Sequence, residues 1–78
     1  MPTILRKEKY RFFFFSNEGN ESPHIHIESD ENYAKFWLEG IVLAKSIGYN
    51  AKELNQIKGI ISENIRFIED KWYEYFSN

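Results

Sequence analysis

The fold is organised around the stretch Pro23-His24-Ile25-His26-Ile27-Glu28. It holds both histidines of the chain, and they alternate with isoleucines at a period of two. Such alternation is typical of a strand that buries one face. If Ile25 and Ile27 point into a core, then His24, His26 and Glu28 share the opposite face, which we expect to be exposed to solvent.

A second alternating stretch follows and predicts a β-hairpin with the first. If Glu31 and Asn32 are the two central residues of a tight turn, the partners on the two strands follow by counting. This register places opposite charges together and apolar side chains together. The predicted pairs are Glu28 with Lys35, Ile27 with Phe36, His26 with Trp37, Ile25 with Leu38 and His24 with Glu39. The predicted core face comprises Ile25, Ile27, Ala34, Phe36 and Leu38, and the outer face His24, His26, Glu28, Lys35, Trp37 and Glu39.

The stretches before and after the hairpin indicate further strands. Tyr10 to Ser16 is rich in aromatic residues and of strand length. Placing Arg11 outside puts Tyr10, Phe12 and Phe14 in the core, although the alternation also allows the opposite assignment, with Phe13 and Phe15 buried. The polar stretch from Asn17 to Pro23 predicts a loop. Residues 41–45 predict a fourth strand or an extended connector.

The C-terminal third predicts one long helix. Asn50 is a good N-cap residue, and Glu53 can complete a capping box, so the helix should begin at Ala51 and run to Phe76. At 1.5 Å per residue it would be about 39 Å long, roughly twice the length of a six-residue strand. It should therefore overhang the sheet, bend near Gly59, or pack on a second copy of the chain. Apolar residues recur at helical spacing: Leu54, Ile57, Ile61, Ile65, Ile68, Trp72 and Tyr75.

We therefore predict an α+β fold: a small, mostly antiparallel sheet of three or four strands packed against one long C-terminal helix. A chain of 78 residues has room for a single domain, with a β-rich part over residues 1–49 and the helix over residues 50–77. Ile60 and Phe67 lie off the main apolar stripe, seven residues apart. A homodimer through this flank of the helix is one hypothesis.

Composition narrows the functional classes. Hydrophobic residues make up 42% and aromatic residues 18% of the chain, which is too rich for a disordered protein. Cysteine is absent, which excludes disulfides and cysteine-ligated metal. The net charge of -2 gives no argument for nucleic acid, although the N-terminal stretch to Phe15 is basic. No stretch approaches the roughly 20 apolar residues of a membrane span. We expect a soluble, unprocessed, cytoplasmic protein that does not bind a membrane.

Two motifs resemble a known family. The stretches from Glu21 to Ile27 and Ala34-Lys35-Phe36-Trp37-Leu38 are similar to the signature of small bacterial proteins called domain of unknown function 4160. The chain departs from the pattern at Ser22, where a second proline is often found. The family has no settled activity. The resemblance implies a role beside a small neighbouring protein, in a gene pair of the toxin-antitoxin kind.

The His-x-His pair first suggests a metal site. Residues two apart on one face of a strand are about 6.6 Å apart, so two imidazoles can converge on one ion at about 2.1 Å. Glu39 is the third ligand that the predicted register places beside His24. The sequence thus allows a divalent metal at His24, His26 and Glu39, with no other cofactor expected. The competing interpretation is a pair of solvated histidines lying over Trp37.

Two further interpretations remain open. In the first, His24 and His26 act as base and acid in the cleavage of an RNA phosphodiester, and Lys35 or Arg11 holds the phosphate. In the second, an uncovered sheet face binds another molecule, with a protein favoured over RNA because positive charge is sparse. The residues of that predicted binding face are Arg11, Phe13, Phe15, His26, Glu28, Trp37 and Glu39. We expect a non-enzymatic binding module with a protein partner, and a ribonuclease-type toxin as the alternative.

Overall fold

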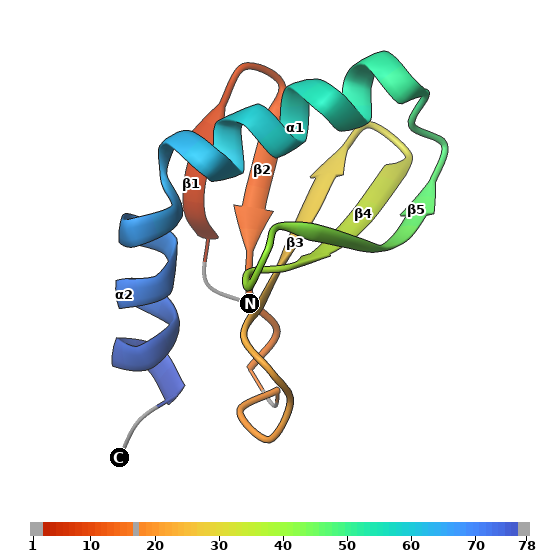
Figure 1. Ribbon diagram of the computed structural model, residues 1–78. Helices are drawn as coiled ribbons and strands as arrows, with labels where there is room; N and C mark the ends of the chain where they lie inside the picture. Colours follow the sequence, from red (N-terminus) through yellow and green to blue (C-terminus); the bar gives the residue numbers. More distant parts are fainter. Residues whose placement is uncertain (1–2, 17, 77–78) are drawn as a thin grey trace.

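The computed structural model describes residues 3–16 and 18–76. Asn17 of the expected loop and Ser77 at the expected end of the helix lie outside the described residues. Figure 1 shows a sheet with one helix lying across it and the C-terminal helix running down beside it. The elements are β1 (Thr3–Lys7), β2 (Tyr10–Phe13), β3 (His24–Ser29), β4 (Asn32–Trp37), β5 (Val42–Ile47), α1 (Ala51–Glu63) and α2 (Ile65–Phe76).

The sheet is a simple meander. All neighbouring strands are antiparallel, and their spatial order is their order in the chain, from β1 to β5. The α+β class is therefore confirmed, but three or four strands was too few, because there are five. The missed strand is β1, whose sequence ends in Arg6 and Lys7. Its side chains are exposed or half-buried, so it lacks the apolar alternation that marks β3.

The β3–β4 hairpin is confirmed, but its predicted register is wrong. Ser29 pairs with Asn32, so the turn is centred on Asp30 and Glu31. Asp30 adopts a φ of 53°, a left-handed conformation that aspartate tolerates better than most residues. The pairing is displaced by two residues, which changes every partner and leaves each side chain on its predicted face.

One face of the sheet forms the hydrophobic core under the helices. All five residues that the hairpin pattern assigned to the core are buried, and so are Tyr10, Phe12 and Phe14 of the first aromatic stretch. The arginine-outside assignment of that stretch is therefore correct. The opposite face is not open, however, because Phe13 is only 2% exposed. The core cluster comprises Tyr10, Phe12, Phe14, Ile25, Ile27, Ala34, Phe36, Leu38, Tyr49, Ile57, Ile60, Ile61, Ile68 and Trp72.

The predicted single helix is two helices. The capping box at the start of α1 is present as expected, with Glu53 N donating to Asn50 Oδ1 over 2.8 Å. The chain turns at Asn64 and not near Gly59. The Asn64 side chain donates to the Ile60 carbonyl at 2.8 Å, and its backbone N–H donates to the carbonyls of Ile60 and Ile61. These bonds close the last turn of α1 and let α2 start in a new direction.

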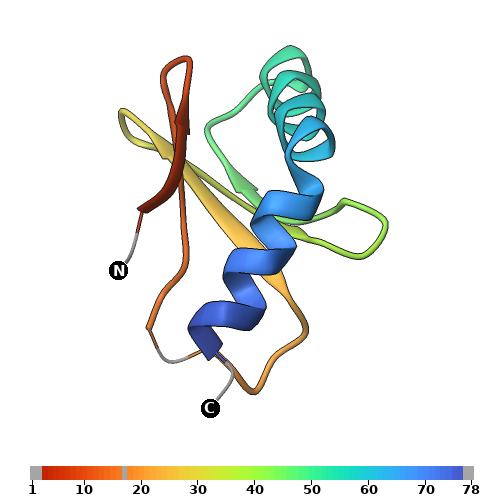
Figure 2. The ribbon, with the colours of Figure 1, turned by 90° about the vertical axis from the view of Figure 1, so that its left-hand side faces the viewer.

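This turn keeps the second half of the apolar stripe on the protein. Figure 2 shows α2 running away from α1 toward the end of the sheet where the β2–β3 loop lies. Trp72 is consequently buried against Phe14, at 5.2 Å between ring centroids. Tyr75, predicted to be buried, is 43% exposed. In the described part of the chain, neither helix is long and apolar enough to cross a membrane.

Candidate functional site

The two histidines of β3 lie on the face opposite the core, as predicted, but they are not exposed. His24 is 0% and His26 2% accessible. Aromatic rings enclose them. His26 stacks on Phe13 at 5.4 Å and on Tyr33 at 5.8 Å between centroids. His24 meets Trp72 of α2 at 5.0 Å. The prediction of solvent-facing histidines is therefore wrong.

The observed β3–β4 register does not place Glu39 beside the histidines. His24 pairs with Trp37 and His26 with Lys35, whereas Glu39 is exposed in the turn after β4. The expected set of His24, His26 and Glu39 is thus not brought together. Lys35 reaches the edge of the site: its Nζ lies 3.1 Å from Glu21 Oε1 and 4.5 Å from the centre of the Trp37 ring.

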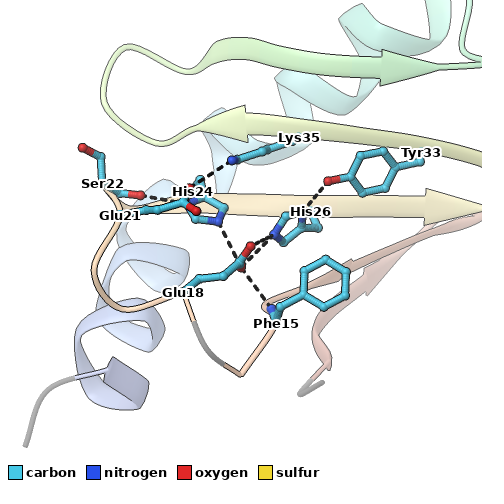
Figure 3. A network of polar contacts seen from close by, with 8 residues as sticks. All are labelled: Phe15, Glu18, Glu21, Ser22, His24, His26, Tyr33 and Lys35. Carbon is cyan, nitrogen blue, oxygen red and sulfur yellow. Dashed lines mark hydrogen bonds and ion pairs between the residues drawn. The ribbon is translucent and has the colours of Figure 1, made fainter.

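A carboxylate from the β2–β3 loop takes the place expected for Glu39. Glu18 Oε1 lies 3.0 Å from His24 Nε2 and 2.8 Å from His26 Nε2, and Glu18 Oε2 lies 2.9 Å from His26 Nε2 (Figure 3). The Phe15 backbone N–H donates to Glu18 Oε1 at 3.2 Å and fixes the carboxylate. Glu18, His24 and His26 are the only group of three or more potential ligands within the described residues. We call them the histidine cluster.

The outer nitrogens of both rings are held by fixed partners. His24 Nδ1 lies 2.7 Å from the Ser22 carbonyl oxygen, which can only accept, so Nδ1 carries the proton. His26 Nδ1 lies 2.6 Å from the Tyr33 hydroxyl, which can donate or accept. Both Nε2 atoms consequently face Glu18.

His24 Nε2 has no hydrogen-bond partner despite its nearness to Glu18. Glu18 Oε1 lies 3.0 Å from this nitrogen but outside the direction of a hydrogen bond, so the nitrogen is unpaired. In the neutral form of the ring with its proton on Nδ1, Nε2 presents a lone pair toward a carboxylate oxygen. A buried acceptor in this position costs free energy unless a cation or proton occupies the space it faces.

Burial and charge set the protonation of the cluster. Burial lowers the pKa of His26 below its usual value and outweighs the opposing effect of Glu18. For Glu18, burial alone would raise the pKa, but the hydrogen bond and charge of His26, together with His24, bring it below its usual value. At neutral pH the site therefore contains a carboxylate and a neutral His26 imidazole.

The residues of the predicted binding face do not form an open aromatic patch. Arg11 Nη1 forms an ion pair with Glu28 Oε2 at 2.7 Å, and Arg11 Cζ lies 4.4 Å from the centre of the Phe13 ring. Phe13 is buried and Phe15 half-buried, with the Phe15 ring 4.5 Å from that of His26. The β2–β3 loop, with Glu18, covers this part of the face.

A surface groove lies next to the cluster. Its volume is about 560 Å³, and two of its residues also touch His24: Ser22 through its carbonyl and Trp37 through its ring, at 5.5 Å. Both charged side chains in its lining are acidic. The groove is lined by Ser22, Pro23, Trp37, Leu38, Glu39, Val42, Glu69 and Tyr73.

Sequence reasoning found the histidines and missed Glu18 and Tyr33. Glu18 lies in a loop, where no periodicity indicates which way a side chain points. Tyr33 was placed opposite Asp30 by the wrong register, and the correct register puts it beside Glu28, one strand away from the ring of His26. The acidic character of the stretch before Pro23 was the one available signal that a carboxylate could reach the histidines.

A family model described as Domain of unknown function (DUF4160) matches residues 10–73, which is most of the chain. The match includes the histidine cluster, the β3–β4 hairpin and most of α2. No curated protein and no solved structure matches the chain.

Proposed function

We propose that this chain, which belongs to the DUF4160 family, is a protein-binding module that acts with a partner encoded beside it, in a gene pair of the toxin-antitoxin kind. The observation that carries the proposal is the exposed edge strand β5. The exposed fractions of Val42, Leu43 and Ile47 are 52%, 41% and 51%. Apolar side chains along an unpaired strand edge are typical of a surface that receives another strand.

The two edges of the sheet differ in this respect. β1 ends in Arg6 and Lys7, and charged residues on an edge strand discourage further pairing. β5 has Lys45 as its only charged residue. The turn that leads into β5 contains Ile41 with a φ of 50°, a conformation that is rare for a β-branched residue. Backbone strain of this kind gathers at binding and catalytic sites.

The groove beside β5 indicates what the partner segment contains. Val42 belongs both to the edge strand and to the groove, so one extended segment could pair with β5 and enter the groove. Glu39 and Glu69 are the charged groups of its lining, and aromatic surface is supplied by Trp37 and Tyr73. We expect a partner segment with apolar residues and at least one lysine or arginine.

Cleavage of RNA by His24 and His26 is not favoured by the same geometry. A general acid or base must lie within hydrogen-bond reach of its substrate. Both histidines are buried, and their ring nitrogens face Ser22, Tyr33 and Glu18. The homodimer through the helix stays a prediction, although Ile60 of the expected flank is buried in the chain's own core.

The test is co-expression with the products of the two neighbouring genes, followed by calorimetric titration of the purified pair. Ile47→Lys should weaken binding at least tenfold, because it puts a charge on the paired edge. The control Arg6→Ala, on the opposite edge, should bind within twofold of the wild type. The proposal fails if neither neighbouring product binds, or if both variants bind equally well.

A further inference from the structure

The histidine cluster has a feature that protein binding at β5 does not explain. His24 Nε2 is buried, has no hydrogen-bond partner, and points toward Glu18 and His26 (Figure 3). Native structures leave few buried polar atoms unpaired, so each such atom calls for a physical reason. An ion that accepts its lone pair would supply that reason.

We propose that Glu18, His24 and His26 form a binding site for a divalent transition-metal ion of the zinc type. Two imidazole nitrogens and one carboxylate oxygen are ligands that Zn²⁺ and its neighbours in the first transition row prefer. Mg²⁺ and Ca²⁺ favour sites built from oxygen alone, which this cluster does not offer.

The distances need only a small adjustment to admit the ion. The candidate ligand atoms all lie within 4.8 Å of one another, and Glu18 Oε1 is 2.8 and 3.0 Å from the two Nε2 atoms. Ligands bonded at about 2.1 Å to a tetrahedral ion are separated by about 3.4 Å. Outward movement of the Glu18 carboxylate by a few tenths of an ångström brings its distances to both Nε2 atoms to this value, and Glu18 belongs to a loop.

The partners of the outer nitrogens suit metal binding. Histidine ligands are usually oriented by a carbonyl, carboxylate or hydroxyl on the other ring nitrogen. The Ser22 carbonyl already holds the required tautomer of His24. In His26 the proton that faces Glu18 must move from Nε2 to Nδ1 when the ion binds. The Tyr33 hydroxyl, 2.6 Å away, can turn from donor to acceptor and accept the hydrogen bond that Nδ1–H then donates.

The ion would join the β2–β3 loop to β3. Glu18 would share the ion with both histidines, and the Ser22 carbonyl already accepts a hydrogen bond from His24 Nδ1. Ser22 and Pro23 form one wall of the surface groove. Metal binding at the cluster would therefore fix the shape of that wall, although the site itself requires no partner protein.

The test is calorimetric titration of the untagged, chelator-treated full chain with Zn²⁺, in the wild type and two variants. The wild type should bind one equivalent. Glu18→Gln keeps the side-chain shape, removes the anionic ligand and should weaken binding at least tenfold. The matched control Glu28→Gln, on the same strand as the histidines and paired with Arg11, should bind within twofold of the wild type.

Absorption of the wild-type complex with Co²⁺ gives a readout that does not depend on how the variants fold. Four-coordinate Co²⁺ with nitrogen and oxygen ligands should give visible bands that Zn²⁺ displaces. Circular dichroism of each variant establishes that it is folded. Absence of saturable Zn²⁺ binding by the wild type would overturn the proposal, as would an equal loss of affinity in the two folded variants.

Discussion

Over residues 24–27 the two faces of β3 are buried to nearly the same extent and by opposite chemistry. Ile25 and Ile27 are fully buried in the apolar core, whereas His24 and His26 are buried around the carboxylate of Glu18. Burial of an isoleucine is favourable by about 1.5–3 kcal/mol. Burial of imidazole and carboxylate costs free energy that hydrogen bonds and charge pairing must offset. The apolar face therefore accounts for stability, whereas the polar face is the one for which we propose a bound ion.

The largest loss of unfolding free energy should come from a substitution on the apolar face of β3. Ile27→Ala leaves a cavity in the hydrophobic core and should lower the free energy of unfolding by about 2–5 kcal/mol. Urea denaturation followed by circular dichroism measures it. Ile47→Ala makes the same chemical change at a side chain that is 51% exposed, and should stay within about 0.5 kcal/mol of the wild type. Equal losses in the two variants would mean that the core is misplaced.

A smaller loss of unfolding free energy should come from removing a hydrogen bond on the buried polar face. Tyr33→Phe keeps the ring against His26 and removes the hydroxyl 2.6 Å from Nδ1, leaving a buried nitrogen unpaired. The metal-free protein should lose about 1–3 kcal/mol of unfolding free energy. Tyr73→Phe, at a side chain that is 60% exposed, is the control and should be close to neutral. A neutral Tyr33→Phe would show that the hydroxyl does not hold His26.

The smallest loss of unfolding free energy should come from a substitution at the exposed end of the same polar face. Glu28 pairs with Arg11 at 2.7 Å, but its side chain is 46% exposed. Glu28→Gln should therefore cost only about 0.2–1 kcal/mol, and the cost should shrink in 1 M NaCl because salt screens exposed charges. Denaturation at low and high salt measures both. A loss as large as that of Tyr33→Phe, unchanged by salt, would contradict the contrast between the buried and open ends of this face.

Alternation predicted which side of β3 and β4 each residue occupies, and no more than that. A displacement of two residues preserves every face, so the core residues were correct while all the predicted cross-strand partners were wrong. Matched side-chain chemistry favoured the wrong register, and the conformation of Asp30 in the turn decided the true one. Glu39 was lost from the site for this reason.

The helix break and the position of Glu18 depend on tertiary structure, which the pattern of residues along the sequence does not contain. The break at Asn64 does not interrupt the apolar stripe, and one asparagine in a helical pattern does not by itself mark a break; the hydrogen bonds from Asn64 to the Ile60 and Ile61 carbonyls that close α1 are seen only in the structure. Likewise, Glu18 reaches the histidines because its loop folds back over β3. The family resemblance was correct, since the family model covers residues 10–73, but it supplied no chemistry for the site.

The central claim is that the polar face of β3 is a binding site and not a second core. The most direct measurement is thermal unfolding of untagged protein at a series of free Zn²⁺ concentrations, with a chelator-treated sample as reference. Above the dissociation constant, each tenfold rise in free Zn²⁺ should stabilise the wild type by about 1.4 kcal/mol, while Glu18→Gln should respond far less. A wild-type unfolding temperature that is the same with Zn²⁺ and with chelator would contradict the claim.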